Sequence, residues 1–90
     1  MKYHHTGIPT QSPKQDETYL EKYDIYCTDH RSNPYAIQWM RYGDKCPLPN
    51  LVKEIPHVAF EVDDIEEAIK GKEVIIKPNS PSEGVIVAFI

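Results

Sequence analysis

The chain has 90 residues, of which ten are Lys or Arg and 14 are Asp or Glu, giving a formal net charge of -4 at pH 7. This acidic balance and the lack of a basic cluster argue against a nucleic-acid partner, because phosphate binding needs concentrated Lys and Arg. No stretch reaches about 18 apolar residues and the first residues lack the apolar run of a signal peptide, so we expect one small cytoplasmic domain without a membrane segment.

The chain begins with a predicted strand that contains His5, Gly7 and Ile8. Residues 9–18 follow it with two prolines and no apolar spacing, so a loop without a helix is expected there. His4 is expected to point to the face opposite that of His5, at the surface of the molecule.

Two further strands are predicted in the first half of the chain. Residues 19–28 and 35–42 alternate β-rich side chains with others, and a polar loop that contains His30 joins them. Their aromatic side chains either line a ligand pocket or serve as core or dimer contacts. The candidates for ligand binding are Tyr26, Trp39 and Arg41, of which Arg41 holds a substrate carboxylate or pairs with a surface acid.

The next segment is a connection without a long element. Residues 43–49 form a turn-rich linker with two prolines, and residues 51–54 are expected to form a short helical turn before Pro56. Cys46 lies in this linker and Cys27 in a predicted strand. Since no CxxC pair is present and the compartment is expected to be reducing, both are predicted to be free thiols.

The most informative stretch is 54–64, an alternating strand that runs into a capped helix. Successive strand side chains point to opposite sides, so His57 and Glu61 share one face, and the apolar side chains Val58, Phe60 and Val62 share the other. Asp63 or Asp64 is expected to cap a helix over 64–70 that Gly71 ends. That helix is predicted to cover Phe60 and its apolar neighbours. His57 and Glu61 then line a concave face on the other side, and Phe60→Ala is expected to cost more stability than His57→Ala.

A fainter copy of this strand opens the chain. Residues 5–9 align with residues 57–61, and in each copy a small residue stands two positions after the histidine and a bulky one three positions after. Such a repeat is typical of a duplicated supersecondary unit.

The chain resembles the glyoxalase / bleomycin-resistance / extradiol dioxygenase superfamily, which has the vicinal oxygen chelate fold. The resemblance rests on His5-Thr6-Gly7-Ile8, on the stretch from His57 to Asp64 with its helix, and on the closing residues 84–90. It implies an α+β domain of paired βαβββ modules that form a curved mixed sheet. Residues 1–45 are then a degenerate first module whose helix is reduced to a loop, and residues 54–90 are a second module that lacks its last strand.

The same resemblance implies a candidate metal site. Family members that bind a divalent metal hold it on the first and last strands of each module, which corresponds here to His5, His57 and Gln38. The fourth position has no counterpart, and Gln38 stands where a carboxylate is usual. Glu61 shares the face of His57 and is a further candidate for ligand contact. The ion, if bound, is Zn, Ni, Mn or Fe.

Two functions follow from the resemblance. One is a small-molecule-binding protein with no assignable reaction, which holds an apolar or aromatic ligand in the cup. The alternative is a divalent-metal-dependent lyase, isomerase or dioxygenase. The incomplete metal set favours the binding protein.

The sequence stops at Ile90 within an apolar predicted strand, residues 85–90, which follows a shorter one at 74–76. An open apolar edge is a template for pairing, and a small domain often gains stability by oligomerising. Either the natural chain continues with a final strand, or a second copy completes the cup. We predict a homodimer with contacts through residues 24–28, 35–42 or 85–90.

Overall fold

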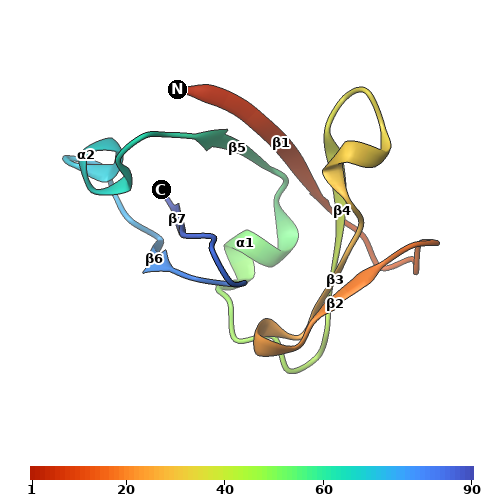
Figure 1. Cartoon of the computed structure of the whole chain (residues 1–90). Helices are drawn as coiled ribbons and strands as arrows, with labels where there is room; N and C mark the ends of the chain where they lie inside the picture. Colours follow the sequence, from red (N-terminus) through yellow and green to blue (C-terminus); the bar gives the residue numbers. More distant parts are fainter.

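The computed structural model describes residues 1–90 as a mixed α+β fold with a five-stranded mixed sheet and a separate two-stranded hairpin. Figure 1 shows the large sheet as an arc, with helix α1 and strand β7 on its inner side. The elements are β1 (Lys2–Pro9), β2 (Thr18–Leu20), η1 (Glu21–Tyr23), β3 (Ile25–Cys27), η2 (His30–Ser32), β4 (Ile37–Tyr42), α1 (Asn50–Glu54), β5 (His57–Glu61), α2 (Ile65–Ile69), β6 (Ile76–Asn79) and β7 (Val87–Phe89).

The order of strands in the large sheet is β2-β3-β4-β1-β5. Strand β1 is central, pairing in parallel with β4 and antiparallel with β5. The remaining pairs, β2 with β3 and β3 with β4, are antiparallel. The first and last strands of residues 1–45 therefore lie side by side, with β5 added beyond them.

A bulge interrupts β1 at His4. Tyr3 is paired with Phe60 and His5 with Ala59, so β1 has one residue more than β5 between these pairs. An extra residue of this kind resets the alternation of side chains. Plain alternation predicted that His4 points to the face opposite that of His5. Because of the bulge, the His4 ring instead lies beside that of His5.

The predicted strand over residues 19–28 is wrong in its middle. The 3-10 helix η1 separates β2 from β3, and Asp24 at its end has a left-handed backbone with φ of 53°. The Asp24 carboxylate accepts hydrogen bonds from the Tyr19 hydroxyl and from the backbone N–H of Lys45. An Asp in this conformation is favoured because its side chain bonds locally, and it turns the chain into a hairpin.

Pairing across the strands assigns the side chains to two faces of the sheet, because directly opposed residues point to the same side. The inner face carries the core, in which Ile25, Cys27 and Cys46 are buried and Met40 and Tyr42 are packed against them. Both cysteines are free thiols, as predicted. Burial raises the pKa of Cys27 and raises that of Tyr42 to about 12.

The helix predicted over 64–70 forms as α2, but it does not cover the apolar face of β5. Asp64 caps α2 by accepting hydrogen bonds from the N–H groups of Glu66 and Glu67, and Gly71 follows with φ of 77°. The helix has only five residues and contacts β7. Val58 and Phe60 are 58% and 51% exposed, so the prediction that they lie in the core is wrong.

The last two strands form a hairpin of their own rather than extending the large sheet. Strand β6 begins two residues later than the predicted 74–76, and β7 is shorter than the predicted 85–90. Phe89 of β7 lies with its ring centroid 5.2 Å from that of His57, so the hairpin faces the inner side of β5. No helix in the structure has both the length and the apolar character needed to cross a bilayer.

Candidate functional site

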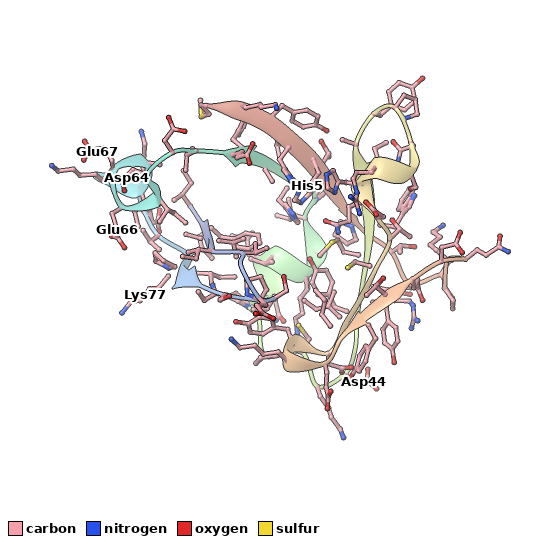
Figure 2. The ribbon with its side chains drawn as sticks, viewed as in Figure 1. His5, Asp44, Asp64, Glu66, Glu67 and Lys77 are labelled. Atoms are coloured by element: carbon pink, nitrogen blue, oxygen red, sulfur yellow. The ribbon has the colours of Figure 1, made fainter.

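The centre of the candidate site is a pair of histidines on neighbouring strands. His5 on β1 and His57 on β5 are 52 residues apart in sequence, and their Nε2 atoms are 3.3 Å apart. Both side chains are half-buried. Figure 2 shows His5 near the middle of the molecule, where β1 runs beside β4 and β5.

The register explains why the two rings meet. His57 is paired with Gly7, and His5 is paired with Ala59. Each histidine therefore lies across from the small residue of the other strand. The His57 ring occupies the space above Gly7, where a Cβ atom would overlap it. The repeated His-x-small pattern is thus the steric condition for bringing the imidazoles together.

Two more histidines lie beside this pair: His4, which is exposed as predicted, and His30, which lies in the predicted polar loop. The Nδ1 atoms of His4 and His5 are 2.8 Å apart, and the His30 ring centroid lies 4.3 Å from that of His4. His30 is in η2, on the loop between β3 and β4, and its Nδ1 is 3.7 Å from the Asp29 carboxylate. All four histidines of the chain therefore form one cluster, which only the bulge at His4 and the path of the loop bring together.

This environment favours neutral imidazoles. Burial, and then the neighbouring His57, His4 and His30, lower the pKa of His5 to about 4. Burial also lowers the pKa of His57. A neutral imidazole has one donor and one acceptor nitrogen, so the contacts from His4 through His5 to His57 form a chain of hydrogen bonds in either direction. In both directions the buried Nδ1 of His57 is left without a partner.

The other predicted members of the site lie at different distances from this pair. Gln38 of β4 is paired with Gly7, so it points to the same face as His57, with β1 between them. Glu61 also belongs to the inner face, but four residues along a strand separate it from His57 by about 13 Å. Glu61 is exposed and is paired with Lys2 at the far end of β1.

A divalent metal fits this arrangement in part. Two imidazoles bound to one tetrahedral ion at 2.0–2.1 Å have their nitrogens about 3.4 Å apart, close to the separation of the His5 and His57 Nε2 atoms. No group of three or more His, Cys, Asp or Glu side chains is arranged to hold a metal ion. The pair supplies two ligands, and Gln38 on the same face is the remaining candidate.

The predicted ligand-binding residues Tyr26, Trp39 and Arg41 are on the other face of the sheet. Arg41 donates two hydrogen bonds to the Glu17 carboxylate, at 2.7 and 3.0 Å, and its guanidinium lies 4.0 Å from the Tyr26 ring centroid. The Lys14 ammonium lies 4.6 Å from the Trp39 ring. Of the two roles considered for Arg41, the pairing with an acid is the one seen. These residues hold the 10–17 loop against the sheet and do not join the histidines.

Two clefts at the surface are lined by residues other than His5 and His57. One of about 560 Å³ lies between the ends of β1 and β4 and helix α1 and is lined by Thr10, Tyr42, Asp44 and Lys53 among others. Another of about 360 Å³ is lined by Lys14, Thr28, Asn33 and Trp39 among others. Both are open and mostly polar in their lining residues. Among the predicted ligand residues, Trp39 lines one of these two clefts, and the histidine pair remains the candidate site.

No protein-family model, no curated protein and no solved structure matches this chain.

Proposed function

We propose that the chain is a small-molecule-binding protein of the glyoxalase/bleomycin-resistance kind, with its ligand on the inner face of the sheet. The observation that carries this proposal is the uncharged His5–His57 pair, whose Nε2 atoms converge to 3.3 Å. Ligand sites combine apolar walls with a few convergent polar groups, and here the imidazoles converge beside the Phe89 ring.

The pair favours a ligand of particular chemistry. Neutral imidazoles donate and accept one hydrogen bond each, so they suit a hydroxyl or carbonyl group better than a carboxylate, which needs a cation. The Phe89 ring suits an aromatic or apolar body. We therefore expect a small aromatic or apolar molecule with one uncharged polar group. No reaction is assigned.

The strand order supports the proposed kinship. In the resembled family the functional residues lie on the first and last strands of each module. Here β1 and β4, the first and last strands of residues 1–45, are parallel neighbours, and β5 brings a second His-x-small strand beside them.

The test is a fragment screen monitored by the imidazole resonances in NMR. Fragments with an aromatic ring and a hydroxyl or carbonyl are expected to shift the His5 and His57 signals. They should bind less well to His57→Ala, while Trp39→Ala, a substitution on the other face, should bind them unchanged. Fragments that bind only near Trp39 and Lys14 would show that the inner face is not the ligand site.

A metal-dependent lyase, isomerase or dioxygenase is the second candidate, favoured by the same Nε2 separation. His5 and His57 would hold a divalent ion with Gln38, and the ion would polarise oxygens of the substrate. Protein purified without chelator should then contain a stoichiometric divalent metal, and its content should fall in both His5→Ala and His57→Ala. A metal content equal in these variants and the unmodified chain would count against this candidate.

A further inference from the structure

Strand β5 forms an open edge of the large sheet. It is the last strand in the order β2-β3-β4-β1-β5, so the backbone groups along its outer side have no partner strand. Val58 and Phe60 are exposed on this strand, and the half-exposed Tyr3 of β1 packs edge-on against Phe60, with ring centroids 6.4 Å apart. Folded proteins normally cover or charge such an edge.

The amount of exposed surface also indicates a missing contact. The chain has a solvent-accessible surface of 6666 Å², and five of its 90 residues are buried. A folded monomer of 10.4 kDa has about 5,400 Å² by the scaling of surface with mass. The difference, about 1,300 Å², exceeds the roughly 800 Å² that each partner contributes to a protein interface of standard size.

The sequence of β5, His-Val-Ala-Phe-Glu, is complementary to itself when read in the opposite direction. An antiparallel pair of two copies centred on Ala59 places His57 opposite the partner's Glu61 and Val58 opposite the partner's Phe60. Opposed side chains in such a pair have Cβ atoms about 4.5–5.5 Å apart and contact each other. The polar pair falls on the inner face and the apolar pair on the outer face.

We propose that two copies of this chain associate through β5, antiparallel and centred on Ala59, to give a continuous ten-stranded sheet with a twofold axis. This register pairs all five residues of the strand. Registers centred on Val58 or on Phe60 use residues outside β5, and they separate His57 from the partner's Glu61. This β5 surface is distinct from residues 24–28, 35–42 and 85–90, through which the sequence predicted the dimer contact.

The dimer places a carboxylate near the candidate site. Within one chain Glu61 lies about 13 Å along the strand from His57. In the proposed pair the partner's Glu61 lies directly across from His57, on the face that carries His5 and Gln38. This consequence for the site depends on the proposed function, but the association itself does not.

A disulfide test addresses the register. Ala59→Cys puts two thiols at the twofold axis, where the Cα atoms of an antiparallel pair are about 4.5–5.5 Å apart, within the range that a disulfide spans. Treatment with diamide should give a covalent dimer. The control is Ala68→Cys, the same substitution at an exposed position in α2, which should give no covalent dimer, and neither should the unmodified chain with its buried Cys27 and Cys46. Equal yields of dimer from Ala59→Cys and Ala68→Cys would overturn the register.

A charge-exchange test addresses the association without covalent trapping. Val58→Lys and Phe60→Glu should each give a monomer by sedimentation equilibrium, because each sets a charge opposite an apolar side chain. The double variant should recover the dimer, since Lys at 58 then faces Glu at 60 of the partner. Circular dichroism of every variant checks that it is folded. An unmodified chain that is monomeric at micromolar to millimolar concentration would refute the proposal, whatever ligand the inner face binds.

Discussion

The imidazole of His57 lies over Gly7, in the place where any larger residue would put its Cβ atom. Adding a methyl group at a packed position typically costs about 1–3 kcal/mol, because neighbours are forced from their preferred positions. Gly7→Ala should therefore destabilise the fold by about that amount. In a double-mutant cycle with His57→Ala, which removes the ring, most of the cost should disappear. Denaturant unfolding of the four proteins measures this coupling, and additive effects would show that the two positions do not meet.

Stability should fall as the pH is lowered from about 6.5 towards 4. The pKa of His5 is about 4 in the folded chain and 6.5 in the unfolded chain. Between these two pH values the unfolded chain binds more protons than the folded chain, so protonation of His5 favours unfolding. The contribution of the neutral His5 ring to the free energy of unfolding is complete above pH 6.5 and is lost as the pH approaches 4. Because the His5 ring is half-exposed, solvent screening weakens this pH dependence, and the free energy of unfolding should fall by about 1–2 kcal/mol between pH 6.5 and 4.

The pKa of His57 is lowered by burial, as that of His5 is, and His4, His30 and Asp29 are the other titratable groups beside the pair. The pKa of Asp29 is lowered to about 2, mainly by the hydrogen bond from Arg31, so its contribution is lost only at lower pH. Urea unfolding at a series of pH values measures the dependence. His5→Gln should flatten it between pH 6.5 and 4, and an unchanged slope would assign the effect to other groups.

The stability of helix α2 should depend strongly on its N-terminal cap, Asp64. Asp64 Oδ1 accepts from the N–H groups of Glu66 and Glu67 at 3.1 and 3.3 Å, in a helix of only five residues. Loss of such a cap costs about 0.5–2 kcal/mol. Asp64→Ala is expected to speed hydrogen exchange at the Glu66 and Glu67 amides, whereas Asp64→Asn, which keeps an acceptor, should not. Equal exchange in the two variants would contradict this role.

The relative cost of Phe60→Ala and His57→Ala should depend on protein concentration. Phe60 is half-exposed in a single chain, so its truncation removes little buried surface there. In a β5-paired dimer it contacts the partner's Val58, and its loss should lower the unfolding midpoint most at high concentration. His57→Ala acts within the chain, but it also removes the contact with the partner's Glu61. A dilution series of thermal unfolding distinguishes the cases, and a concentration-independent Phe60→Ala effect would argue for burial within one chain.

Much of the local structure could be predicted from the sequence because short-range rules determine it. The Asp64 cap, the end of α2 at Gly71, the helical turn near residue 52 and the loop over 9–18 follow from residue types and spacing alone. The alternation of β5 also correctly placed His57 and Phe60 on opposite faces. It did not determine which face is covered, because that depends on where a helix of only five residues lies, and α2 lies beside β7.

The candidate site was predicted only in its two central residues. The repeat identified His5 and His57, since each is followed two positions later by a small residue, Gly7 or Ala59. It gave no sign of His4 or His30 in the cluster. A bulge in β1 brings His4 to the pair and a loop brings His30, and neither a bulge nor a loop leaves a periodic pattern in the sequence. Trp39 and Arg41 share the strand of Gln38, yet alternation puts them on the other face of the sheet.

The reciprocal register of β1 and β5 bears on how such a centre can arise. Each strand provides one histidine and the small residue that lies across from the other histidine, so the two segments are interchangeable about a local twofold axis. A chain with a single His-x-small strand would create the same pair of imidazoles by binding a copy of itself. Gene duplication within one chain and association between two chains are thus equivalent routes to this centre. A substitution that enlarges either small residue would in both cases have to be matched on the opposing strand.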